Sequence, residues 1–476
     1  MKVQLCNSLY LNNTALITQN KKFNEFQKNN SYNTYPNNYY IFSPNFKATN
    51  LELISKMETA LKDNKQKELM SFFEQMSDTA KKNVKGVVEK FKNNGLTLDN
   101  YIPACIKLPQ LFYKSSETLG KNVKCLVEKF ENNGLTLDNY IPACIKVPPL
   151  FNQSPETLEK NVREFVKKFE ANGLSLDNYI SACIKVPPLF HQSPETVEKN
   201  VKELVEKFKD NGLTLDKYIS ACIKQPQLFT LSSETIEKNV KELVRKFEAN
   251  GLTLDNYIPA CIKVPSLFTR SSETLKRNVK EFVEKFKNNG LTSDNYISAC
   301  IKQPSLFCYT PETIEKNVKD VVKKFEANGL TLDNYITACI KQPPLFYQSP
   351  KTIKEHIDVL RFSRFNNGKE IDNEQFWTQI LKYPMKLSCS SSLLLTEGII
   401  VPKMFEGKQI PSALKGNYLK QKLEDYLKAN PDKKYVLNIK NIPAETDCAG
   451  LLQNYLEKLT EELKLPKDIY KINLIN

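Results

Sequence analysis

The 476-residue chain lacks the residues and runs on which several classes of function depend. It has only two histidines, His191 and His356, so a metal centre built from several histidines is not expected. No apolar run approaches the roughly 18 residues that a membrane-spanning helix needs. No phosphate-binding P-loop, dinucleotide fingerprint or Gly-x-Ser-x-Gly elbow occurs. We therefore expect no enzyme active site, no cofactor, no metal and no membrane insertion.

Positive charge is in surplus. The chain has 68 Lys and Arg against 54 Asp and Glu, a net charge of +14, which favours polyanions or acidic surfaces as partners. Apolar residues make up 41% and aromatic residues 10% of the chain, enough for a packed core and too much for wholesale disorder.

An internal repeat of 39 residues organises most of the chain. One copy, from Ser154 to Phe190, reads SPETLEKNVREFVKKFEANGLSLDNYISACIKVPPLF. Seven regular repeats occupy about 78–350, and worn copies flank them at 72–84 and 364–387, as expected where end copies must cap an open core. Glycine, proline and cysteine each recur seven times at this step; their first and last copies are Gly95 and Gly329, Pro109 and Pro343, and Cys105 and Cys339.

Each repeat is predicted to be two helices and a turn. In the second repeat, an apolar stripe of helical spacing follows Ser115 and ends at Gly134, which suits a left-handed cap. A second stripe begins after Thr136 and is stopped by Pro148. The Pro-x-Leu-Phe that follows is long enough for one turn, with its Leu and Phe plugging the seam. A lone helical pair cannot bury both stripes, so we predict an all-α repeat solenoid of stacked pairs.

The two ends of the chain differ from the repeats. Residues 1–69 are predicted to form an N-terminal leader that is partly disordered, and residues 70–387 the solenoid. Residues 388–476 lose the repeat and predict a small C-terminal α/β region. Its expected elements are strands over 435–440 and 469–474 and helices near 414–428 and 447–464.

The solvent side of the second helix carries positive charge without a paired acid. At 100° per residue, an Asn and the final Lys of this helix fall opposite the apolar stripe. Stacking would align these lysines in a row, beside a row of Asn in which Lys217 replaces one Asn. We interpret the lysines, Lys217 included, as a track for the phosphates of DNA or RNA. A lysine at a helix carboxyl end also suits the helix dipole, and duplication copies a residue whether or not it binds anything. The lysines are Lys107, Lys146, Lys185, Lys224, Lys263, Lys302 and Lys341.

The first helix is expected to be a solvated, salt-bridged surface. Glutamate precedes lysine by four residues in several repeats, the favourable order for pairs within one helix. The seven repeats together have a net charge of only +7, so any preference for polyanions must come from segregation of charge. The expected pairs are Glu164 with Lys168, Glu203 with Lys207, Glu242 with Lys246, and Glu281 with Lys285.

Positions that vary between repeats follow the Leu-Phe pair. In modular readers of nucleic acid, a constant frame with variable tips can carry a code of one repeat per base. Drift at exposed loop positions is the alternative, and we favour it. The variable tips are Lys114, Gln153, His191, Gln192, Thr230, Arg270, Tyr309 and Gln348.

The cysteines are predicted to fill the core. The chain has twelve, and seven lie on the apolar stripe of the second helix, where neighbouring copies would be about 10 Å apart, too far for a disulfide. Because no secretory signal is evident, we expect a reducing compartment, the cytoplasm, with organelle import and secretion as an effector left open. We expect a monomer.

The repeat resembles the mitochondrial transcription termination factor (mTERF) family. The residues that carry the resemblance are Asn-Gly-Leu-Ser at 172–175, Pro-Pro-Leu-Phe at 187–190 and their copies, over about 70–387. The resemblance implies a curved helical-repeat protein that binds nucleic acid along one face and acts in transcription, ribosome assembly or RNA handling. The near-identical, nearly neutral repeats and the α/β tail depart from that pattern.

Two functions of different classes fit this sequence. The first is a non-catalytic protein that binds DNA or RNA along the basic face of its second helices. The alternative is a solenoid for protein–protein interaction, such as an effector of an intracellular bacterium. Both use the same scaffold, so the fold does not choose between them.

Overall fold

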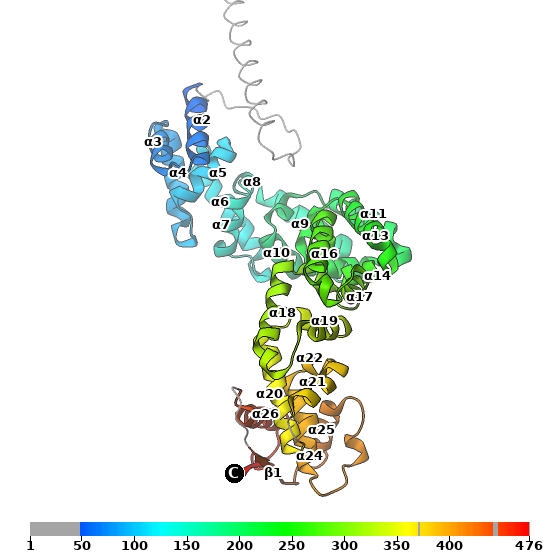
Figure 1. Ribbon diagram of the computed structural model, residues 1–476. Helices are drawn as coiled ribbons and strands as arrows, with labels where there is room; N and C mark the ends of the chain where they lie inside the picture. Colours follow the sequence, from blue (N-terminus) through cyan, green and yellow to red (C-terminus); the bar gives the residue numbers. More distant parts are fainter. Residues whose placement is uncertain (1–47, 370–371, 441–445, 476) are drawn as a thin grey trace, which may run out of the picture. The chain divides into compact units, whose positions relative to one another are not determined.

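The computed structural model describes residues 48–369, 372–440 and 446–475 (Figure 1). The first 47 residues of the predicted leader lie outside the described residues. The chain divides into two compact units, 1–83 and 84–476.

The described part of the first unit is helical. Helices α2 (Ala48–Lys62) and α3 (Gln66–Glu74) pack against each other, and α4 (Asp78–Phe91) begins here. Leu69 and Phe73 of α3 are fully buried. Helical structure thus already occupies residues 48–69 of the segment predicted to be leader.

The second unit contains the repeats as pairs of helices (Figure 1), which confirms the predicted all-α solenoid. The first helix of each pair packs on the first helix of the next, and the second helix on the next second helix. The first helices after α4 are α6 (Ser116–Phe130), α9 (Pro155–Phe169), α11 (Pro194–Phe208), α13 (Ser233–Phe247), α16 (Ser272–Phe286), α18 (Pro311–Phe325) and α20 (Pro350–Asn366). The second helices are α5 (Leu98–Lys107), α7 (Leu137–Lys146), α10 (Leu176–Lys185), α12 (Leu215–Lys224), α14 (Leu254–Lys263), α17 (Ser293–Lys302), α19 (Leu332–Lys341) and α21 (Asn373–Lys382).

Local residues set the helix ends, as repeat three illustrates. The Ser154 hydroxyl accepts the Thr157 backbone N–H and caps α9, with Pro155 at the first helical position. A short 3₁₀ turn (Glu170–Asn172) leads to Gly173, whose φ of 89° is left-handed. The Leu174 N–H then donates to the Phe169 carbonyl at 3.2 Å, closing the helix end as predicted.

The Pro-x-Leu-Phe segments form single turns. Most are 3₁₀ and a few are α-helical, and their Leu and Phe are buried. Phe151 of repeat two meets Tyr101 of repeat one edge-on at 5.2 Å, and Phe229 of repeat four meets Tyr179 of repeat three at 5.9 Å. The Phe therefore plugs the seam, as predicted. The turns are η2 (Pro109–Phe112), α8 (Pro149–Asn152), η5 (Pro187–His191), η7 (Pro226–Thr230), α15 (Ser266–Thr269), η10 (Pro304–Cys308) and η12 (Pro343–Phe346). In the worn eighth repeat, α22 (Met385–Ser388) takes their place without the Pro-x-Leu-Phe motif, and its Leu387 is buried.

A second inter-repeat contact clamps the loop side of the array. In repeats one to six, the Asn before the repeat Gly donates through its side-chain amide to the Asp in the first turn of the next second helix, at 2.6 to 2.8 Å. The six clamps are Asn94–Asp138, Asn133–Asp177, Asn172–Asp216, Asn211–Asp255, Asn250–Asp294 and Asn289–Asp333.

The chain after α22 builds a separate core on α20. A broken helix follows, consisting of α23 (Ser391–Leu395), a π-helical turn (Thr396–Ile400) and α24 (Val401–Met404). Next come α25 (Leu419–Lys428), β1 (Tyr435–Lys440), α26 (Cys448–Glu462) and β2 (Tyr470–Ile475). The two predicted strands and helices are thus present, within one residue at the strands and a few residues at the helices.

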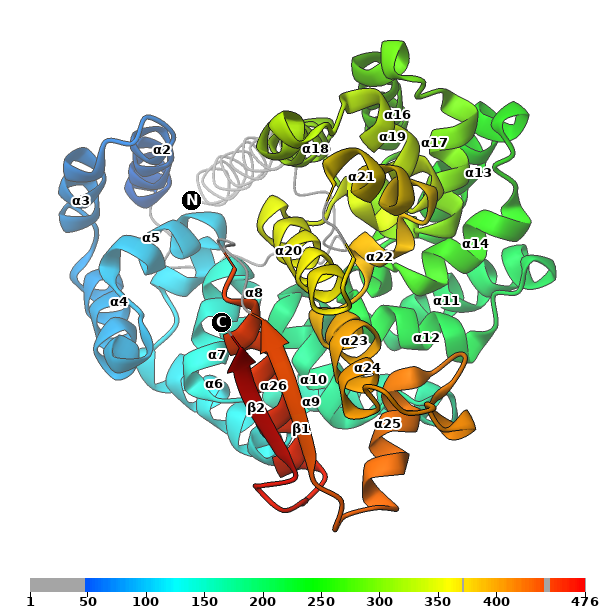
Figure 2. The same ribbon diagram turned by 60° about the horizontal axis from the view of Figure 1, so that its bottom comes forward.

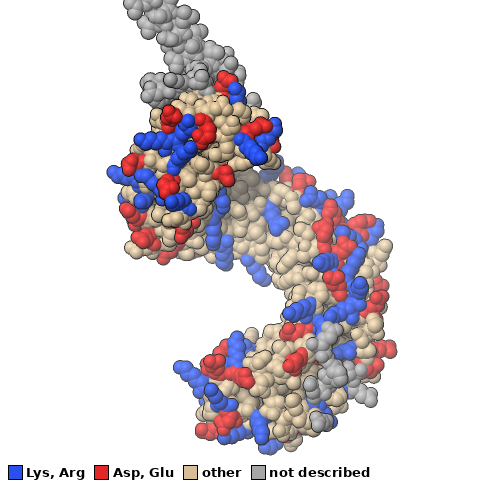
Figure 3. Space-filling model, turned by 90° about the vertical axis from the view of Figure 1, so that its left-hand side faces the viewer, with Lys and Arg blue, Asp and Glu red and all other residues tan. Residues whose placement is uncertain are grey.

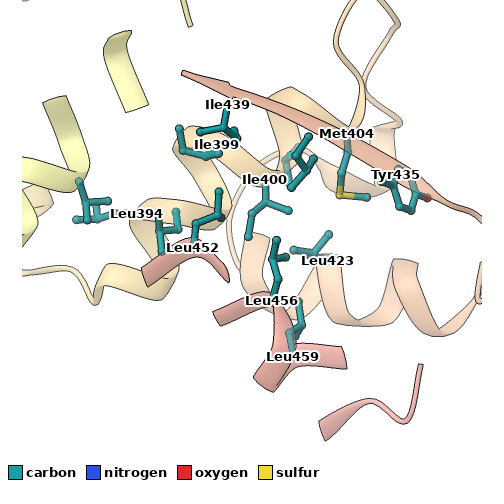
Figure 4. Close-up of a cluster of buried hydrophobic side chains, with 14 of the residues drawn as sticks. Leu394, Ile399, Ile400, Met404, Leu423, Tyr435, Ile439, Leu452, Leu456 and Leu459 are labelled. Carbon is teal, nitrogen blue, oxygen red and sulfur yellow. The ribbon is translucent and has the colours of Figure 1, made fainter. Parts of the chain in front are cut away.

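The two strands are parallel, with Tyr435 opposite Tyr470 and Ile439 opposite Leu474 (Figure 2). Alternate residues of β1 point into an apolar cluster that α24, α25 and α26 complete (Figure 4). A buried ion pair lies beside it, in which Lys354 Nζ is 2.7 Å from Asp358 Oδ2. The Thr446 hydroxyl donates to the same carboxylate oxygen at 2.6 Å, so this network joins α20 to the start of α26.

Candidate nucleic-acid interface

The seven predicted lysines each occupy the last position of a second helix, from Lys107 of α5 to Lys341 of α19. We call these seven residues the lysine row. All seven are exposed. Within the described part of the chain, none of them has a carboxylate within 4.0 Å or a hydrogen-bond acceptor for its ammonium group. The second helices of neighbouring repeats pack on each other, and packed helices have axes roughly 8–10 Å apart, so the helix ends that carry successive lysines are expected at about this spacing.

The lysines at the ends of the first helices behave differently. Lys168 Nζ lies 2.5 Å from Glu198 of the next repeat, and Lys207 lies 2.7 Å from Glu237. This contact lowers the pKa of Glu198 and raises that of Lys168. The predicted pairing of Glu164 with Lys168 inside one helix is therefore wrong, because the lysine reaches across the layer to the neighbouring helix. Further contacts of this type are Lys129 with Glu159 and Lys285 with Glu315.

Four of the six asparagines in the predicted row, Asn100, Asn139, Asn256 and Asn295, are engaged in the fold through their side chains. Asn100 accepts the Thr97 N–H and donates to the Gly95 carbonyl at 2.8 Å, which closes a capping box. Lys217 takes the same role in repeat four, because its Nζ donates to the Gly212 carbonyl at 2.9 Å. The ammonium group of Lys217 is thus held in a cap, unlike those of the lysine row.

The surface one helical turn before the lysine row is small and uncharged. This position is proline in three repeats and Ser or Thr in four, and its side chains are exposed or half-buried. Nothing there blocks the approach of an anion to the lysine that follows. The residues are Pro103, Pro142, Ser181, Ser220, Pro259, Ser298 and Thr337.

The structure adds an eighth lysine that the sequence reasoning missed. Helix α21 of the worn eighth repeat ends on Lys382, two residues before Pro384, as each regular second helix ends two residues before its proline. Lys382 is exposed, and its Nζ lies 5.5 Å from the ring centre of the exposed Tyr383. The Lys-x-Pro spacing in the sequence could have identified Lys382. Two extra residues between Gly368 and Pro384 shift it out of the 39-residue step.

The variable tips are less exposed than the sequence suggested. All eight are half-buried. Tyr309 stacks on Tyr347 of the next repeat at 5.0 Å, whereas Thr230 donates to the Gln227 carbonyl of its own turn at 2.8 Å. The side-chain carbonyls of Gln153 and Gln348 are buried. These positions are therefore partly covered by the fold, and Tyr309 contributes to the seam between repeats six and seven.

Other reactive groups are built into the core. The seven repeat cysteines are fully buried and free, as predicted, and burial raises the pKa of each thiol, as for Cys222. His356 is buried, with Nδ1 2.6 Å from the Leu387 carbonyl. Across the ranges that the structure describes, no cluster of three or more His, Cys, Asp or Glu could hold a metal, and no helix is long and apolar enough to span a bilayer.

The charges are not evenly mixed over the face of the molecule that Figure 3 shows. Figure 3 shows acidic and basic side chains intermingled over part of the visible face, whereas in the middle of the view basic side chains stand on a largely uncharged background. This distribution agrees with segregation of charge rather than a general excess.

A family model described as mTERF matches residues 51–246, 150–309 and 196–364, which together cover more than half of the chain. No curated protein matches it.

Proposed function

Since the chain belongs to the mTERF family, we propose that it is a non-catalytic helical-repeat protein that binds DNA or RNA along the lysine row. The fold and the family membership are established by the repeats and the match. The ligand and the surface are the proposal.

The observation that carries the proposal is the contrast between two sets of lysines on the same scaffold. The first-helix lysines Lys129, Lys168, Lys207 and Lys285 bind glutamates of the next repeat. The lysine row has no such partners among the described residues, although each repeat carries several acids. An exposed row of like charges is unfavourable in the free protein, and a polyanion removes that cost when it binds.

The spacing of the row suits a nucleic-acid backbone. A DNA strand presents one phosphate per 3.4 Å of helix axis. Because the strand also winds about that axis, helix ends spaced about 8–10 Å apart would meet about every third phosphate only where the row follows the turn of the strand. Seven such contacts would release counterions and give log K a slope of about −6 against log salt. This interaction positions a backbone and carries no base preference by itself.

The test compares two variants with equal changes of charge. One replaces three central row lysines (Lys185→Glu, Lys224→Glu, Lys263→Glu). The control replaces three first-helix lysines of the same repeats (Lys160→Glu, Lys199→Glu, Lys238→Glu), whose side chains are 70 to 74% exposed. Binding to a labelled 30-base-pair DNA duplex and to the matching RNA is followed by fluorescence anisotropy at several salt concentrations.

We expect the row variant to bind about a hundredfold more weakly, with a salt slope reduced by about 3, and the control to bind within about threefold of the unchanged protein. Equal losses in both variants would mean that only net charge matters. Unchanged binding in the row variant would place the interface elsewhere. An unchanged protein without salt-dependent binding would favour the protein-interaction alternative.

A further inference from the structure

The position one turn before each row lysine is occupied in an unusual way. Serine, threonine and especially proline are poor choices inside an exposed helix, where Ala, Lys or Glu would stabilise it more. Pro142 is the sixth residue of α7 and cannot donate a backbone hydrogen bond there. Helix stability therefore does not account for this set of residues; what they share is that they are small and uncharged.

Four of the seven repeats carry a hydroxyl at this position: Ser181, Ser220, Ser298 and Thr337. A hydroxyl inside a helix commonly donates to the carbonyl four residues earlier. None of these four makes that bond or any other within the described chain. By contrast, the Ser154 and Ser175 hydroxyls cap helices. The four hydroxyls beside the lysine row are thus not used by the fold within the described residues.

Each of these hydroxyls lies beside a row lysine. Ser181 and Lys185 are four residues apart on α10, so their Cβ atoms are about 5–6 Å apart on the same face. A phosphodiester has two anionic oxygens, and one can accept from the hydroxyl while the other accepts from the ammonium group. In repeats one, two and five a proline ring stands at this position and offers no donor.

We propose that Ser181, Ser220, Ser298 and Thr337 pair with the next lysine of the row to form two-point phosphate sites, so that repeats three, four, six and seven hold the backbone more tightly than repeats one, two and five. This inference rests on the proposed function and adds a ranking of the repeats to it. The strong sites fall in two adjacent pairs separated by repeat five.

The test removes the hydroxyls and leaves every charge in place. The variant carries Ser181→Ala, Ser220→Ala, Ser298→Ala and Thr337→Ala, and alanine favours the helix, so folding is preserved. The control removes four exposed hydroxyls of first helices (Thr157→Ala, Thr196→Ala, Thr235→Ala, Thr313→Ala). A third variant adds hydroxyls (Pro103→Ser, Pro142→Ser, Pro259→Ser). Affinity for the same 30-base-pair duplex and RNA is measured across a range of salt.

We expect the first variant to bind about tenfold or more weakly with an unchanged salt slope, because neutral groups release no counterions. We expect the control to bind normally and the proline replacements to bind several-fold more tightly. If the hydroxyl variant binds normally while the Lys→Glu variant fails, this inference is overturned and the proposed function stands. A changed salt slope would overturn it too, since the lysines would then have moved. If the unchanged protein shows no salt-dependent binding, both the proposed function and this inference are overturned.

Discussion

The clamp between Asn172 and Asp216 should stabilise the junction between repeats three and four by a measurable amount. The Asn172 amide donates to Asp216 Oδ1 at 2.7 Å in a partly exposed setting. A hydrogen bond of this kind contributes about 1 kcal/mol net. Replacing Asn172 with Ala leaves the Asp216 charge in the first turn of α12, where it still favours the helix dipole, so about 1 kcal/mol is the expected loss.

Buried cysteines on either side of the junction can report this loss of stability. Cys183 and Cys222 are fully buried on the second helices on either side of the junction, and burial raises the pKa of both thiols. A maleimide therefore labels them only when the junction opens. A loss of about 1 kcal/mol raises the open population, and hence the labelling rate, about fivefold. Mass spectrometry of the labelled peptides reads each cysteine separately.

Because each repeat contacts only its neighbours, the effect should stay local. Cys339 of repeat seven should label at its original rate in the Asn172→Ala protein. The matched variant Asn289→Ala cuts the clamp to Asp333 and should move the effect to Cys300 and Cys339. Labelling that is unchanged at every cysteine, or raised equally at all of them, would refute this account of how repeats are joined.

Two further predictions concern charge. The lysine of the preceding repeat lowers the pKa of four glutamates below the ordinary 4.5: Glu159, Glu198, Glu237 and Glu315. These ion pairs therefore stabilise the folded protein fully above pH 4.5, and their contribution is lost as the pH falls through the lowered pKa values. Urea midpoints should therefore fall more steeply below pH 4.5 in the unchanged protein than after Gln replaces all four, and parallel curves would contradict this. Lys354→Met leaves the buried Asp358 carboxylate without its cationic partner, which should destabilise the carboxyl-terminal core by about 3–5 kcal/mol. Maleimide should then label the buried Cys448 faster. Adding Asp358→Leu should restore most of the protection, and a double variant as labile as the single one would refute the pairing.

The sequence predicted those structural features that are determined by residues within one repeat. Helix starts at Ser154, the left-handed cap at Gly173, the stop before Pro187 and the buried Cys183 all follow from neighbours a few residues away. The exposure of the lysine row follows in the same way from the spacing of residues along one helix. These features were predicted correctly because helical periodicity and capping depend on local spacing.

Contacts between repeats could not be predicted in the same way. Lys168 binds Glu198, 30 residues on, and Asn172 binds Asp216, 44 residues on. Such partners depend on how one layer of helices is displaced against the next, which the pattern of one repeat does not specify. For the same reason the variable positions could be taken for exposed tips, although all eight are half-buried and Tyr309 stacks on Tyr347 of the next repeat.

Protection of individual lysines by nucleic acid tests the central claim most directly. Lysines are reductively methylated with and without a saturating 30-base-pair duplex or its RNA counterpart, and each site is quantified by mass spectrometry. We expect strong protection of Lys185, Lys224 and the other members of the lysine row, with Lys160 and Lys199 modified as in the free protein. Equal modification of both sets, or protection confined to the first helices, would contradict it.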